Sequence, residues 1–156
     1  MRTAITLMFL GCFVLIGMAG NAGADEKSQV TYEKEVKPII AARCLSCHGS
    51  DAPTVSDFKK DKEGFKKKMK GPRMESYANL ILFVKGEDAG ALMRRLDDGK
   101  NKPDGKPGNM YVWLGKTEPE RAENLSTMKK WVGEWTLKRK GEMTEEELKK
   151  IKAPEK

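Results

Sequence analysis

The chain has 156 residues, of which 34% are charged and 38% hydrophobic, and its formal net charge is +7. A chain of this length forms one modest domain with a genuine hydrophobic core. The positive charge indicates either a solvated surface or electrostatic steering towards an acidic protein or an anionic membrane. It does not indicate nucleic-acid binding, because no recognisable nucleic-acid-binding motif accompanies it.

The N-terminus is predicted to be a signal peptide over residues 1–24. Arg2 supplies a positive start, residues 4–18 form an apolar run, and Ala-Gly-Ala at 22–24 matches a cleavage site. Cys12 lies inside the apolar run and not after it, which argues against a lipoprotein. An uncleaved membrane anchor is the alternative, but the run is short and ends in small residues. We therefore expect an exported protein.

Three segments are expected after the signal peptide. Residues 25–30 form a short polar linker, residues 31–140 form the folded domain, and residues 141–156 form a charged C-terminal tail. No internal repeat and no alternating strand pattern of useful length is present, so the fold class is predicted to be mostly α.

The first helix of the domain is expected to end at the cysteine pair. Residues 32–36 predict a lead-in turn, and Pro38 suits the first position of a helix that runs to about Cys47. Residues 49–73 predict a long, loosely structured connection. Seven lysines crowd residues 59–70 of this connection. They indicate a solvated insertion or, alternatively, a docking face for an acidic partner.

The middle of the chain predicts two helices and then a long loop. Apolar residues recur at helical spacing over residues 74–84, with Gly86 as the stop, and again over residues 88–96. Residues 98–116 are rich in glycine and proline, which predicts an irregular loop, and this loop carries Met110.

The last long helix is predicted to open at a capping box over residues 117–120. Apolar side chains continue as far as Trp135, and the helix is expected to run towards Gly141. A second capping box over residues 144–147 predicts a short charged helix within the tail.

The pentapeptide Cys44-Leu45-Ser46-Cys47-His48 carries the strongest functional signal. Two cysteines at this spacing reach the two vinyl groups of one porphyrin, and the following histidine becomes an axial ligand of the iron. A zinc site would need about four ligands. A thioredoxin-like dithiol would stand at a helix N-terminus. Two structural cysteines would leave the adjacent histidine unexplained. The motif therefore predicts one covalently bound haem c with its iron.

Residues 32–40 (YEKEVKPII), followed by residues 43–49 (RCLSCHG), resemble the opening of a class I c-type cytochrome. They are especially similar to the small single-haem domains of planctomycete-type cytochrome c proteins. The similarity continues through a helix opened by residues 86–88, a glycine-proline loop with a methionine, and a last helix with Trp131. It implies a small helical domain wrapped around the haem and attachment outside the bacterial cytoplasm, in agreement with export. It also implies that Gly71-Pro72 supplies the carbonyl that holds the histidine ring, although Pro53 is nearer in sequence.

The second axial ligand is less constrained by the sequence. His48 is the only histidine in the chain, which leaves methionine, lysine, a weak ligand or nothing opposite it. In the resembled family the axial methionine belongs in the loop before the last helix, where this chain has Met110, and Met74 is the next candidate. Many relatives place proline after this methionine, whereas this chain has Tyr111.

These residues predict a periplasmic one-electron carrier and not an enzyme. Its partners are expected to be redox proteins, either acidic or membrane-bound. An open sixth position would instead give a five-coordinate haem sensor or a peroxidase-like enzyme. The absence of a second histidine as a distal acid or base argues against peroxidase chemistry. A haem subunit of a larger redox complex is the third alternative.

Overall fold

The computed structural model describes residues 29–156, and the predicted signal peptide at residues 1–24 lies outside them. The described part of the chain is helical, and its only strand-like pairing is an isolated bridge between Gly133 and Ile151. No helix within residues 29–156 has the length and apolar character needed to span a bilayer. The predicted fold class, mostly α, is confirmed.

The N-terminal helical segment begins as the lead-in turn that the sequence predicts. A π-helical turn, η1 (Tyr32–Val36), is capped by Thr31, whose hydroxyl accepts a hydrogen bond from the backbone of Lys34. It leads directly into α1 (Lys37–Arg43), with Pro38 in the first turn, where its missing N–H costs nothing. The short helix α2 (Leu45–His48) then completes the segment.

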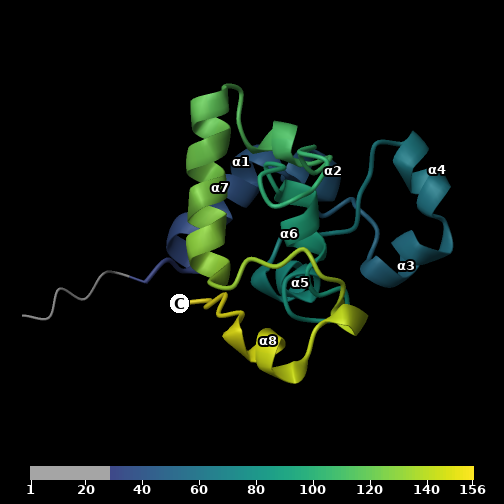
Figure 1. Ribbon diagram of the computed structural model, residues 1–156. Helices are drawn as coiled ribbons and strands as arrows, with labels where there is room; N and C mark the ends of the chain where they lie inside the picture. The colour runs from purple at the N-terminus through teal and green to yellow at the C-terminus, as the bar shows by residue number, and fades with distance from the viewer. Residues whose placement is uncertain (1–28) are drawn as a thin grey trace, which may run out of the picture.

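The connection predicted to be loose contains two short helices, α3 (Val55–Lys60) and α4 (Lys62–Lys67). Each begins at a side-chain cap, the first at Thr54 and the second at Asp61. The rings of Phe58 and Phe65 face each other with centroids 6.2 Å apart, which gives the pair a small apolar contact of its own. In Figure 1 both helices stand away from the rest of the molecule.

The two middle helices are shorter than their apolar patterns suggest. The first is α5 (Tyr77–Leu80), continued by the 3₁₀ turn η2 (Ile81–Phe83). The second is α6 (Ala91–Leu96), which starts after Gly90 at a φ of +77°. A Cβ at Gly90 would also collide with the backbone carbonyl of Lys138, so both geometry and space favour glycine here.

The last long helix, α7 (Glu118–Val132), follows the 3₁₀ turn η3 (Tyr111–Leu114) and begins at the Thr117 cap as predicted. The expectation that it runs past Trp135 is wrong. It stops at Gly133, which has a φ of +79°. Gly133 pairs with Ile151, so a segment distant in sequence fixes the end of the helix.

The C-terminal segment contains η4 (Lys140–Glu142) and α8 (Glu145–Lys150), the short helix predicted from its capping box. After α8 the chain returns to the lower end of α7 (Figure 1). Ile151 and Ala153 are buried there, in one core with Tyr32 and Trp131. The carbonyl of Pro154 accepts hydrogen bonds from the backbone of Tyr32 and from the Trp131 indole.

Candidate haem-attachment site

The junction of α1 and α2 brings the three motif residues into one tight turn. The backbone N–H of Cys44 ends α1 by bonding to Ile40, and that of His48 bonds back to the carbonyl of Cys44 at 2.9 Å. Cys44 and Cys47 are free thiols, and all three side chains are half-buried. The turn therefore leaves both sulfur atoms available for covalent attachment.

The His48 ring is oriented by a carbonyl 24 residues further along the chain. Its Nδ1 lies 2.6 Å from the oxygen of Pro72. A carbonyl can only accept, so Nδ1 carries the proton and donates it, and the lone pair of the neutral ring is on Nε2. Burial lowers the pKa of His48, and Arg95 lowers it further against the effect of the Pro72 hydrogen bond. The ring is thus prepared to bind a metal through Nε2.

A strap over residues 70–74 presses against the motif and makes this orientation rigid. The backbone N–H of Gly71 donates to Cys47 at 3.0 Å, and that of Met74 donates to His48 at 2.8 Å. A Cβ at Gly71 would lie 2.6 Å from Nδ1 of His48, so only glycine allows the strap to come this close. The structure therefore assigns the ring-holding carbonyl to Pro72 and not to Pro53.

The thiols do not have the character of a redox-active dithiol. Burial raises the pKa of Cys44 to about 11, and the neighbouring Cys47 adds to this increase. A reactive dithiol needs the opposite, a thiolate stabilised at neutral pH. The neutral Cys44 thiol, the oriented imidazole and the glycine that makes room for it instead fit a covalently attached haem.

Met110 occupies the start of η3, at the end of the long loop. Its backbone N–H donates to the carbonyl of Arg95 at 2.9 Å, so the residue is attached to the last turn of α6. Its side chain is half-buried and packs against the core. By contrast, Met74 belongs to the strap that is bonded to His48, so its backbone lies on the histidine side.

The remaining methionines of the domain have other environments. Met93 and Met128 are fully buried in the core, where they pack among other apolar side chains. Met69 is 69% exposed. Of the two candidates from the sequence, Met74 and Met110, only Met110 has a backbone that is bonded to α6 and not to the strap beside His48.

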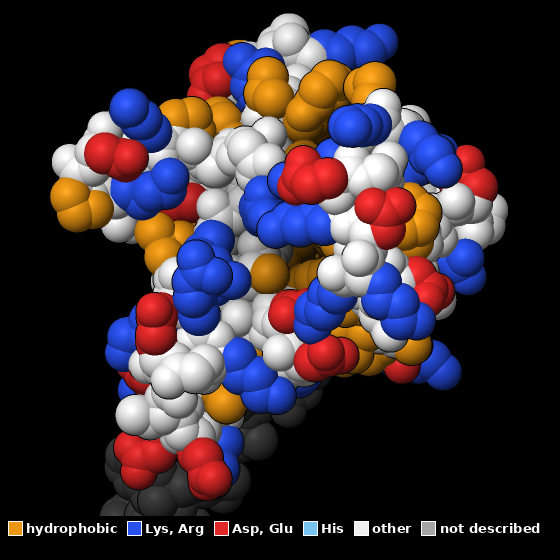
Figure 2. Space-filling model, turned by 90° about the vertical axis from the view of Figure 1, so that its right-hand side faces the viewer, with side chains coloured by type: hydrophobic (Ala, Val, Ile, Leu, Met, Phe, Trp, Pro, Cys, Tyr) orange, Lys and Arg blue, Asp and Glu red, His pale blue; other side chains and the backbone are white. Residues whose placement is uncertain are grey.

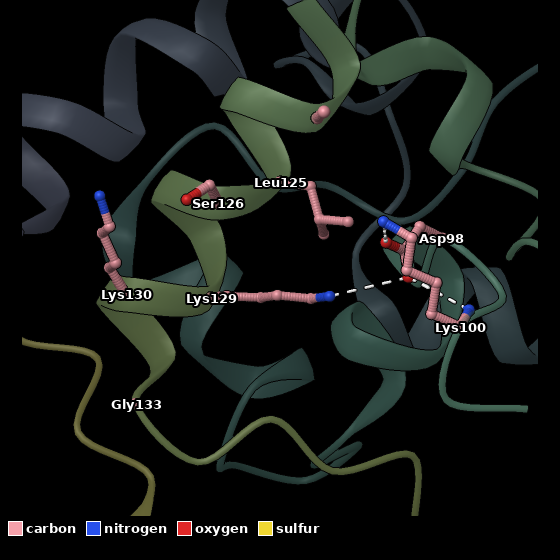
Figure 3. A pocket seen from close by; sticks show the side chains of 8 residues that line it. Asp98, Lys100, Leu125, Ser126, Lys129, Lys130 and Gly133 are labelled. Carbon is pink, nitrogen blue, oxygen red and sulfur yellow. Dashed lines mark hydrogen bonds and ion pairs between the residues drawn. The ribbon is translucent and has the colours of Figure 1, made fainter. Parts of the chain in front are cut away.

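A groove of about 450 Å³ lies along α7, away from the motif. Figure 3 shows the side chain of Lys129 reaching across it towards Asp98, where the two form an ion pair of 3.7 Å. Lys100 approaches the same carboxylate at 3.4 Å. None of the predicted site residues lines this groove, so it is a separate surface feature.

Sequence reasoning missed Asp97, which is completely buried at the end of α6. Nothing in an apolar pattern singles out a buried carboxylate, since charged residues are normally exposed. The available signal was local: an aspartate two residues before Gly99 is typical of a turn in which the side chain accepts a backbone hydrogen bond.

The helical fold and the buttressed histidine turn define a small c-type cytochrome. Residues 31–154 match a family model described as PccH cytochrome c, so the chain belongs to this family of single-haem cytochromes. The chain is similar to the solved monohaem cytochrome PccH from Geobacter sulfurreducens, with 51% sequence identity and a TM-score of 0.76. The match covers 81% of this chain and 98% of the other. A search of curated proteins gives no match. The cofactor is therefore one covalently bound haem c with its iron.

Proposed function

We propose that the protein is an exported one-electron carrier, with the haem attached through Cys44 and Cys47 and the iron held between His48 and Met110. The observation that supports this most is the His48 ring, whose Nδ1 is bonded to Pro72 at 2.6 Å so that Nε2 presents its lone pair. A bound haem iron supplies the chemistry, because it accepts and returns a single electron.

Four side chains are proposed to attach the haem, bind its iron and set its redox potential. Cys44 and Cys47 would fix the porphyrin by thioether bonds. His48 would bind the iron through Nε2, and its hydrogen bond to Pro72 increases the basicity of the ring. The thioether of Met110 is a soft ligand that favours Fe(II) and so raises the potential. His48 is the only histidine in the chain, so no second imidazole is present to act as an acid or base in an enzyme.

The optical spectrum of the reduced protein with carbon monoxide tests the axial ligands. A carrier with Met110 in place is six-coordinate, binds carbon monoxide poorly and, when oxidised, shows a thioether-to-iron charge-transfer band. The variant Met110→Ala should lose the band and bind carbon monoxide readily. Ready binding by the unaltered protein would favour a sensor, and a band that survives in Met110→Ala would exclude Met110.

Export to the periplasm is the second part of the proposal and rests on the sequence of residues 1–24. Mass spectrometry of the protein recovered from the periplasmic fraction should show a mature chain that begins at Asp25. Retention of residues 1–24 in a membrane fraction would instead indicate an uncleaved anchor. A cytoplasmic protein without haem would contradict export.

The partner is proposed to be an acidic redox protein, soluble or membrane-bound, that docks on the lysine-rich helices α3 and α4. Figure 2 shows the face that carries these helices, where basic side chains alternate with acidic ones. Within the described residues, four of the seven lysines form ion pairs: Lys59, Lys60, Lys66 and Lys70. The attraction available to a partner comes mainly from the other three, Lys62, Lys67 and Lys68.

Stopped-flow electron transfer at several ionic strengths tests this docking. Changing the three unpaired lysines to glutamine should slow transfer at low salt and flatten the salt dependence. The same change at three exposed lysines near the C-terminus is the control: Lys149, Lys150 and Lys156. If the two sets of changes slowed electron transfer equally, the effect would come from the net charge of the protein and not from a docking face on α3 and α4.

A further inference from the structure

The carboxylate of Asp97 is fully buried and accepts three hydrogen bonds, two from the loop after α6 and one from the segment after α7. Its Oδ1 accepts from the backbone N–H of Gly99 at 2.8 Å. Its Oδ2 accepts from the amide of Asn101 at 2.9 Å and from the indole of Trp135 at 3.1 Å. The end of α6, the following loop and the segment after α7 therefore meet at one carboxylate.

The same residue begins the loop that leads to Met110. The carbonyl of Asp97 accepts from the backbone N–H of Gly108 at 2.7 Å, and that of Arg95 accepts from Met110 at 2.9 Å. These two bonds attach the far end of the loop to the last turn of α6. Gly108 is required there, because a Cβ would collide with the carbonyl of Arg95.

All three groups that face the carboxylate are N–H donors, so the site suits an ionised acid and nothing else of its size. Burial alone would raise the pKa of Asp97, but the bonds from Asn101, Trp135 and Gly99 lower it, with help from Lys129. An asparagine in this place would direct its own NH₂ group at one of the donors. At least one bond would be lost and one buried N–H left without an acceptor.

We propose that Asp97 is a positioning residue for the iron ligand Met110. The carboxylate holds the loop closed against the end of α6, and this fixes the backbone from which the Met110 thioether reaches the iron. The inference rests on the proposed axial role of Met110. It adds that the coordination depends on a buried negative charge which does not itself touch the haem.

The experiment compares Asp97→Asn with Asp98→Asn in the haem-loaded protein. Asp98 is the adjacent aspartate, and its ion pairs with Lys100 and Lys129 lie in the groove and not in the core. In Asp97→Asn the thioether-to-iron band should weaken, and affinity for carbon monoxide should rise about tenfold or more. The Asp98→Asn variant should match the unaltered protein. An unchanged band in Asp97→Asn, or an equal loss in Asp98→Asn, would overturn the proposal.

The background Met110→Ala separates positioning from general loosening of the fold. If Asp97 acts through Met110, adding Asp97→Asn to Met110→Ala changes carbon monoxide affinity no further. The same rise in both backgrounds would overturn the proposal. If Met110→Ala alone keeps the band, the proposed ligation fails and the inference with it. If Met110→Ala loses the band and Asp97→Asn keeps it, only the inference fails.

Two milder variants serve if Asp97→Asn does not fold. Asn101→Ala and Trp135→Phe each remove one donor and leave the carboxylate in place. Each should weaken the charge-transfer band part of the way, and the pair together more than either alone. A band of full strength in the double variant would overturn the proposal.

Discussion

Replacing Gly71 by alanine tests whether the strap over residues 70–74 holds the histidine ligand. An alanine Cβ at this position would lie 2.6 Å from Nδ1 and 2.8 Å from Nε2 of His48, and closer still to Cε1. Ordinary contact begins at 3.4 Å. Contact with Nδ1 alone requires the strap and the ring to separate by roughly 0.8 Å, and the nearer Cε1 requires more, because neither can be compressed.

The effect on the iron can be worked out from the bond that this movement breaks. The hydrogen bond from His48 to Pro72 is 2.6 Å long, and the same separation carries it to or beyond the limit of about 3.2 Å. Loss of such a partner weakens a metal ligand by about 10–100-fold, or about 1.4–2.8 kcal/mol. A less basic imidazole stabilises Fe(III) less than before, so the potential should rise. If the whole loss falls on Fe(III), the rise is about 60–120 mV.

A spectroelectrochemical titration of Gly71→Ala measures this directly. The matched control is Gly141→Ala, because a Cβ at Gly141 would meet nothing within 4 Å. We expect an increased potential in the first variant and an unaltered one in the second. If Gly71→Ala kept both its potential and its Pro72 hydrogen bond, detected as a retained Nδ1 proton signal, the strap would not be what holds the ring.

Three further predictions concern stability. The hydrogen bond to Glu118, together with burial, raises the pKa of Tyr111 to about 12. The stability that this pair contributes is complete below the ordinary tyrosine pKa of 10.0 and is lost as the pH rises towards 12. When thermal unfolding is followed at increasing pH, Tyr111→Phe should not show this loss. If the melting temperatures of the variant and the unaltered protein fell in parallel, the prediction would be wrong. Deleting residues 151–156 should cost about 3–6 kcal/mol in urea unfolding, because buried Ile151 and the Pro154 acceptor are lost, whereas deleting Lys156 alone should cost little. Met128→Ala should lower the free energy of unfolding by about 2–5 kcal/mol, because Met128 is fully buried. Substitutions of exposed residues change it by about 0.5 kcal/mol. A value near zero for Met128→Ala would place Met128 outside the core.

The parts of the fold that the sequence predicts are those determined by neighbouring residues. The caps at Thr117 and Thr144 each need a hydroxyl and a backbone N–H three residues later, and both are present. Pro38 predicts the start of α1 because its ring fixes φ and removes one donor. The haem motif is local in the same sense, since one turn holds both thiols and the imidazole.

The parts that the sequence does not predict depend on contacts between distant segments. Helix α7 stops at Gly133 because that residue pairs with Ile151, and a residue pattern confined to the helix carries no trace of the pairing. The Asp97 site is only partly local: its turn to Gly99 lies within the sequence pattern, whereas its donor Trp135 lies 38 residues away. The helices α3 and α4 are an exception, because their caps at Thr54 and Asp61 are local, but their lysine-rich sequence has too few apolar residues to show a helical period.

The two proposed iron ligands, His48 and Met110, are held by different parts of the chain. On one side, the strap over residues 70–74 bonds to the motif turn, to residues 51–53 that follow it and to Phe65 in α4. On the other, the backbone of Met110 depends on α6 and on the carboxylate of Asp97. No hydrogen bond among the described residues joins the strap to the loop. The proposed ligands would nevertheless share one iron, so their contributions to the potential are separable only if a Gly71→Ala/Asp97→Asn double variant shows the sum of the two single shifts. In the proposed arrangement, a change at the strap acts on the basicity of His48, and a change at Asp97 acts on the position of Met110.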